Sequence, residues 1–169
     1  MEKSKYILFF NQIGIDMIDQ VGGKNASLGE LYNQLKPIGV NIPNGFAITA
    51  AGYRLFRQKN NLEKSLDDIL NLLDTEEYSN LTEIGEKARA LILSATIPDE
   101  IRAEIITSYQ SLSKQSETKN LGVAVRSSAT AEDLPSASFA GQMESFLNIT
   151  GADQLLDAVL HCYVSLFTD

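Results

Sequence analysis

The sequence is poor in the residues on which several common kinds of site depend. It contains one cysteine, one histidine and no tryptophan in 169 residues. The single cysteine, Cys162, excludes an intramolecular disulfide, and one cysteine with one histidine excludes a zinc site built from these two residue types within the chain. No apolar run approaches the roughly 20 residues of a membrane-spanning helix, and the apolar stretch at 6–10 is too short for a signal peptide. We therefore expect a cytosolic protein with no membrane partner.

Basic residues are also scarce. The 14 Lys and Arg residues are outnumbered by 22 Asp and Glu residues, which gives a formal net charge of −8. Binding to DNA or RNA requires clustered Lys and Arg to neutralise phosphates, and the sequence has no such cluster. We expect no nucleic-acid partner. A phosphorylated ligand would have to be held by a few well-placed cations and backbone N–H groups.

The chain does contain enough apolar residues for a packed core, with 44% hydrophobic and 21% charged residues. Its length suits one domain. Alternating and helical periodicities predict an α+β fold. A strand followed by a turn is expected over 6–15, and further strands at 46–48, 123–125 and 143–149. Helices are expected after Gly22, from an N-cap at Thr49 to about Lys59, after Pro98, and from Asp153.

The middle of the chain, over about 50–118, is predicted to be mostly helical, with a polar loop at 111–120. Two apolar stripes indicate its buried faces: Leu62, Leu66, Ile69, Leu70 and Leu73, then Leu81, Ile84, Ala88, Leu91 and Ile92. A stripe of Leu28, Leu31, Tyr32 and Leu35 marks the helix after Gly22. The acidic pairs at 67–68 and 76–77 are interpreted as solvated helix faces.

One candidate anion site is the sequence GGKNASL at 22–28. Two glycines let the backbone approach a ligand and adopt positive φ, and the helix that follows presents free N–H groups to an anion. Lys24 adds a cation at the same end. The spacing is not that of a P-loop or of a dinucleotide fingerprint. Local pattern alone also allows a simple turn before a helix with an exposed lysine.

A second candidate is the sequence VAVRSSAT at 123–130. Arg126, at the end of an apolar strand, is placed to fork onto phosphate oxygens, and the residues after it offer hydrogen-bond donors. Arg126 alone is equally compatible with an ion-paired residue at a strand end. The third segment, at 133–142, is rich in small residues and suits a loop that closes over a ligand, or a plain surface connection.

No nucleophile paired with a general base is evident, so no catalytic residue is expected within the chain. His161 is interpreted as a solvated residue on the last helix, and Cys162 as a packing residue.

The three segments together resemble the ATP-binding N-terminus of the phosphoenolpyruvate synthase and pyruvate phosphate dikinase family. The resemblance rests on NQIG at 11–14, VGGKNASLGE at 21–30, IPNGFAIT at 42–49, VRSSATAEDLP at 125–135 and ASFAGQ at 137–142. SLFTD at 165–169 resembles the start of a further motif, so we expect residues 1–169 to be the first part of a longer ATP-binding domain, with a helical insert over about 50–118.

The resemblance implies an ATP-grasp-like domain whose first subdomain this chain represents. It implies that Lys24 and Arg126 contact ATP phosphates, that the loop containing Gly141 covers them, and that Ser145, where threonine is more usual, faces the nucleotide. Met143 replaces a residue that is commonly polar. The Mg²⁺ ligands, a phosphohistidine domain and a pyruvate-binding barrel are expected outside this chain, so the chain by itself should bind ATP without turning it over.

The family contains enzymes with different final acceptors. The sequence NASLGE at 25–30 favours one branch of the family. Enzymes of this branch use ATP and water to convert pyruvate to phosphoenolpyruvate, AMP and phosphate through a phosphohistidine. Rifampicin phosphotransferases share similar motifs and are the nearest alternative, whereas pyruvate, phosphate dikinases differ after the arginine. A nucleotide-binding module without catalysis is the alternative of a different class.

Overall fold

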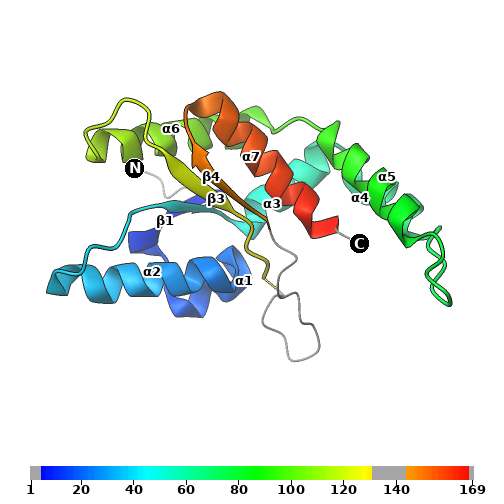
Figure 1. Cartoon of the computed structure of the whole chain (residues 1–169), viewed down its shortest axis with the longest axis horizontal. Helices are drawn as coiled ribbons and strands as arrows, with labels where there is room; N and C mark the ends of the chain where they lie inside the picture. Colours follow the sequence, from blue (N-terminus) through cyan, green and yellow to red (C-terminus); the bar gives the residue numbers. More distant parts are fainter. Residues whose placement is uncertain (1–4, 131–143, 168–169) are drawn as a thin grey trace.

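The computed structural model describes residues 5–130 and 144–167, in which helices surround two small antiparallel sheets (Figure 1). The α+β class expected from the sequence is confirmed. The strands are β1 (Ile7–Phe9), β2 (Phe46–Ile48), β3 (Val123–Arg126) and β4 (Ser145–Ile149). The helices are α1 (Ile18–Val21), α2 (Gly23–Leu35), α3 (Ala50–Lys59), α4 (Leu62–Leu70), α5 (Leu81–Leu93), α6 (Asp99–Gln115) and α7 (Ala152–Val164), with 3-10 turns η1 (Phe10–Gln12), η2 (Ile15–Met17), η3 (Lys36–Ile38) and η4 (Ser165–Phe167).

The first sheet pairs β1 with β2, with Leu8 opposite Ala47. The strand followed by a turn expected over 6–15 is confirmed, because β1 ends at Phe9 and residues 10–12 form η1. The side-chain Oε1 of Gln12 stabilises this turn by accepting the backbone N–H of Phe9 at 2.9 Å. The turn directs the chain away from the sheet and into the segment that carries α1 and α2.

The buried face of α2 consists of small residues and one tyrosine. These residues are Gly23, Ala26, Gly29 and Tyr32. The preceding turn lies so close that a Cβ on Gly29 would come within 2.6 Å of the Ile13 Cβ. The expectation that leucines mark the buried side of this helix is therefore wrong for Leu31, which is 46% exposed. Close backbone approach, which only small residues permit, replaces a leucine stripe here.

The larger core lies among α3, α4, α5, α6, α7 and β1. Its fully buried members include Phe56, Ile92, Ile101 and Ile105. Phe56 packs against Tyr53 and Tyr163, with ring centroids 6.3 and 4.9 Å away. The predicted N-cap of α3 is confirmed, because Thr49 Oγ1 accepts the backbone N–H of Gly52 at 3.3 Å. This core packs α3 against α7.

The second sheet pairs β3 with β4 and packs against α7 (Figure 1). Tyr109 ties this unit to α6. Its hydroxyl donates to the carbonyl of Leu121 at 2.7 Å and accepts the N–H of Gly151 at 2.8 Å. These two bonds secure the entry to β3 and the start of α7, so the hairpin is held at both ends.

The middle of the chain is helical, as expected, and consists of α3 to α6. Two details differ from expectation. Helix α6 continues to Gln115, so the first half of the polar segment expected as a loop belongs to the end of this helix. In the apolar stripes, Leu66 and Ile84 are buried, but Leu70 and Leu81 are 41% and 37% exposed. Both leucines lie where α4 and α5 extend beyond the core.

Within residues 5–130 and 144–167, no helix combines the length and apolar character needed to cross a bilayer.

The aromatic packing around Phe56 gives a prediction about stability. Phe56→Ala removes a side chain that is 0% exposed, so we expect a loss of about 3–5 kcal/mol in the free energy of unfolding, measured by urea denaturation. Ile38→Ala, at a position that is 73% exposed, is the control and should change stability by no more than about 0.5 kcal/mol. Similar effects of the two substitutions would contradict this core assignment.

Candidate functional site

The Gly-Gly-Lys turn joins α1 directly to α2. Gly22 closes α1 by donating its N–H to the carbonyl of Ile18 at 2.9 Å, and it is the residue from which α2 begins. Its φ of 80° and ψ of 159° lie in a region that is essentially restricted to glycine. No side chain caps the first N–H groups of this 13-residue helix, and Lys24 in its first turn is exposed. The turn therefore has the geometry of an anion-binding helix start.

Arg126 lies at the end of β3, directly opposite Ser145 at the start of β4. Its Nε–H donates to Ser145 Oγ at 3.1 Å. Both side chains are exposed. The structure thus joins two of the predicted site residues by a hydrogen bond that orients the guanidinium group. Sequence reasoning placed both residues near a nucleotide but gave no reason to pair them, because strand register is set by the fold.

The two candidate segments are in contact. A Cβ built on Gly22 would lie 2.3 Å from Ser128 Oγ and 2.9 Å from the carbonyl oxygen of Ala129. Only a residue without a side chain therefore fits at position 22 while the segment after β3 keeps its path. Lys24 and Arg126 each stand two residues along the chain from this contact, which brings the two candidate segments together.

Two hydroxyl groups lie buried at this contact. Ser127 is 6% exposed, and the Oγ atoms of Ser127 and Ser128 have no hydrogen-bond partner in the part of the chain that the structure describes. Burying a hydroxyl without a partner costs about 1–3 kcal/mol, so such groups are uncommon and are often found at functional sites. The sequence indicated donors after Arg126 in general, and only the structure singles out these two.

The other residues predicted for this region lie partly outside the part of the chain that the structure describes. Gly141, Met143 and most of the small-residue loop fall in 131–143, outside the described residues, so their place near the phosphates stays a prediction. A cavity of about 520 Å³ lies elsewhere, between α1 and the start of α3. Its lining is Lys5, Leu8, Gln12, Met17, Gln20, Thr49, Ala51 and Arg54. Lys24, Arg126 and Ser145 do not line this cavity, and among the described residues their side chains are exposed.

The residues of the last helix, α7, that the sequence singles out are a packing cysteine and a solvent-exposed histidine. Cys162 is buried, and burial raises the pKa of its thiol to about 12, which keeps it protonated and unreactive. This confirms the expected packing role. The His161 side chain is 41% exposed and lies 3.9 Å from Asp157, one turn earlier on the same helix. This position agrees with a solvated helix face.

Gly22 offers a sharp test, because Gly151 has nearly the same backbone conformation with nothing within 4 Å of a built Cβ. Gly151→Ala should cost only the backbone strain, about 1–3 kcal/mol. Gly22→Ala adds the collision with Ser128 and should destabilise by a further 1–3 kcal/mol or so in urea denaturation.

Adding Ser128→Ala to Gly22→Ala removes the nearest colliding atom and should restore part of the loss, the remainder reflecting the backbone atoms at 2.9 Å. Equal costs for the two glycine substitutions, or no rescue, would show that the segments are not packed against each other at this point.

Comparison with known proteins agrees with this geometry. Residues 18–169 match the model of a family described as pyruvate phosphate dikinase, AMP/ATP-binding domain. The chain is 45% identical to the phosphoenolpyruvate synthase of Aquifex aeolicus, covering 100% of this chain and 20% of that relative. It is 43% identical to the phosphoenolpyruvate synthase of Escherichia coli, covering 98% of this chain and 21% of that relative. The chain thus spans about one fifth of these relatives. Because the family match extends over nearly the whole sequence, the chain belongs to the pyruvate phosphate dikinase AMP/ATP-binding domain family.

Proposed function

We propose that this chain is the ATP-binding part of a phosphoenolpyruvate synthase. The complete enzyme would use ATP and water to convert pyruvate to phosphoenolpyruvate, AMP and phosphate through a phosphohistidine. The identity to phosphoenolpyruvate synthases supports this reaction. The cytosolic location expected from the sequence belongs to the same proposal.

The observation that carries the proposal is the contact between Gly22 and Ser128. It supports a common role for Lys24 and Arg126, because the two cations flank one contact. Each segment alone is a weak anion site. A polyphosphate that meets Lys24, Arg126 and the free N–H groups of α2 together is held by several charge-assisted interactions, which are the stronger class of hydrogen bond.

The roles of the side chains follow from the geometry. Arg126 is anchored through Nε to Ser145, so its terminal Nη groups are the ones that would fork onto phosphate oxygens. Lys24 would act as a mobile point charge at the other side. The buried hydroxyls of Ser127 and Ser128 lie between them. These residues would hold and neutralise the phosphates while charge redistributes, which is the main demand of phosphoryl transfer.

Other parts of the complete site are proposed to lie elsewhere. Among the described residues, no group of three or more His, Cys, Asp or Glu side chains could hold a metal ion. The described residues thus offer no cluster of three or more such ligands, and no step is assigned to Mg²⁺ on this chain. We assign its ligands, the phosphohistidine domain and the pyruvate-binding barrel to the rest of the polypeptide. Residues 1–169 would be the first part of an ATP-grasp-like domain with α3 to α6 as a helical insert, and Gly141 would belong to a loop over the phosphates.

The relatives bear differently on two alternative functions of the chain. A rifampicin phosphotransferase would use a similar ATP-binding front half, but the relatives reported above support the synthase and lend this alternative no support. A nucleotide-binding module without catalysis describes the expected behaviour of this chain when it is studied alone.

Arg126→Ala in the full-length enzyme should lower the rate of the ATP half-reaction by roughly 10²–10³-fold, because a preorganised donor to the phosphates is lost. Pyruvate binding should be unchanged. Phosphohistidine formation from radiolabelled ATP and pyruvate titration measure the two effects. Arg102→Ala, which removes an exposed arginine on α6, is the matched control. Unchanged ATP binding and histidine phosphorylation in Arg126→Ala would contradict the assignment.

The purified 169-residue chain should bind ATP without hydrolysing it, since much of the proposed site lies outside it. Lys24→Ala should weaken binding in calorimetry by about tenfold, the effect of roughly 1.4 kcal/mol. Magnesium-dependent ATP hydrolysis by the wild-type chain that disappears in Lys24→Ala would show that the site is more complete than proposed.

A further inference from the structure

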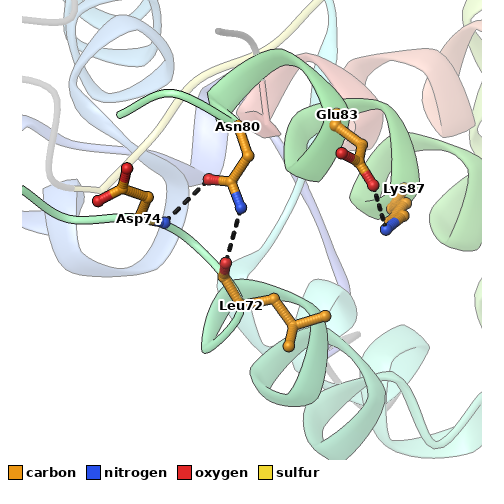
Figure 2. Close-up of polar contacts among 5 residues, drawn as sticks. All are labelled: Leu72, Asp74, Asn80, Glu83 and Lys87. Atoms are coloured by element: carbon orange, nitrogen blue, oxygen red, sulfur yellow. Dashed lines mark hydrogen bonds and ion pairs between the residues drawn. The ribbon is translucent and has the colours of Figure 1, made fainter. Parts of the chain in front are cut away.

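The far end of the α4–α5 hairpin carries a concentration of negative charge. Residues 65–86 contain seven of the acidic residues of the chain and no Lys or Arg. They are Asp67, Asp68, Asp74, Glu76, Glu77, Glu83 and Glu86. This segment, which includes the end of α4 and the start of α5, lies at one end of the longest axis of the molecule (Figure 1). Its formal charge is −7, and one of these acidic residues, Glu83, is paired with the adjacent Lys87 at 2.6 Å (Figure 2).

The loop between the two helices has a fixed shape. Asp74 accepts the backbone N–H groups of Glu76 and Glu77 at 3.1 and 3.2 Å and the hydroxyl of Ser79 at 2.7 Å. These bonds, that of Ser79 foremost, lower the pKa of Asp74 and keep it ionised. Asn80 closes the loop, as Figure 2 shows, by accepting the N–H of Asp74 at 2.9 Å and donating to the carbonyl of Leu72 at 2.8 Å.

This ordered loop displays apolar side chains to solvent. We call the four residues Leu70, Leu72, Tyr78 and Leu81 the apolar tip; they are 41%, 61%, 57% and 37% exposed. Tyr78 has a φ of 53°, a conformation that is unusual for a bulky residue. Strained backbone persists where surrounding bonds enforce it, and it often occurs at functional positions. A fixed apolar surface with a polar rim is typical of an interaction site.

The charges around the apolar tip restrict what can cover it. A second copy of this chain docked through the same face would bring two segments of charge −7 together, and such repulsion opposes association. Nucleic acids and anionic membrane surfaces are disfavoured for the same reason. We propose that the apolar tip binds a separate partner protein through an amphipathic helix whose apolar side chains cover Leu72 and Tyr78 and whose Lys and Arg residues face the acidic rim.

The proposal combines two known modes of recognition. The apolar side chains provide burial, with the aromatic Tyr78 as the expected centre of the interface. The acidic rim provides steering and selects against acidic partners, with an effect that falls as salt rises. The site is independent of the phosphate residues, which lie on the α2 start and on β3 and β4, so its failure would leave the proposed function untouched.

A labelled peptide tests the proposal on this chain. The probe is a helix of about 18 residues, long enough to fold, with leucines on one face and lysines on the other. Its matched control has glutamates in place of the lysines. Fluorescence anisotropy should show binding of the lysine peptide only. Leu72→Ser with Tyr78→Ser should weaken this binding at least tenfold with all charges retained, and Glu76→Lys with Glu77→Lys should weaken it and reduce its salt dependence.

The variant Ile38→Ser with Val40→Ser removes exposed apolar residues elsewhere and should bind as the wild type does. Thermal unfolding checks that each variant folds. The proposal is overturned if the lysine peptide does not bind, if the glutamate peptide binds equally well, or if the apolar-tip variant binds like the wild type. It is also overturned if sedimentation shows a wild-type dimer that this variant separates, or if hydrogen exchange of the full-length polypeptide shows residues 70–81 already covered by its own remainder.

Discussion

The missing side chain at Gly22 determines how the two halves of the candidate site meet. Gly22 ends α1, starts α2 and packs against Ser128 at a distance that excludes any Cβ. The turn that carries Lys24 and the strand end that carries Arg126 are held together by backbone contact at this position. Long charged side chains alone would hold them loosely, because each exposed ion pair or hydrogen bond contributes little against side-chain entropy.

The rest of the fold supports this contact from two sides. The α1–α2 segment is fixed on β1 and β2 by a small core of Ile13, Val21, Ala26 and Ala47. The β3–β4 hairpin is fixed on α7, and Tyr109 secures both the entry to β3 and the start of α7. The cations can therefore remain exposed while their backbone positions are set by buried residues. Such an arrangement suits a site that must neutralise phosphates without large reorganisation.

The helical middle has two different surfaces. Near the body of the molecule, Phe56, Leu66, Ala88 and Ile92 are buried and belong to the main core. At the far end, the bonds of Asp74 and Asn80 give the loop its shape without burying the apolar tip. Order at that end comes from hydrogen bonds, so it does not require the exposed leucines and Tyr78 to pack inward. This is why Leu70 and Leu81 are exposed, whereas Leu66 and Ile84 in the same predicted stripes are buried.

The sequence by itself determined which residues can bind phosphate and whether each lies at the start of a helix or at the end of a strand. Two glycines before Lys24 and an apolar strand before Arg126 predicted an anion-binding helix start and a cation at a strand end, because these are local properties of backbone and charge. The cap at Thr49 and the packing role of Cys162 followed in the same way. Only the tertiary structure decided that Gly22 meets Ser128, that Arg126 pairs with Ser145, that Leu31 faces solvent, and that Leu70 and Leu81 lie on an exposed tip. These facts depend on which segments distant in sequence come to lie side by side, and local periodicity carries no information about that.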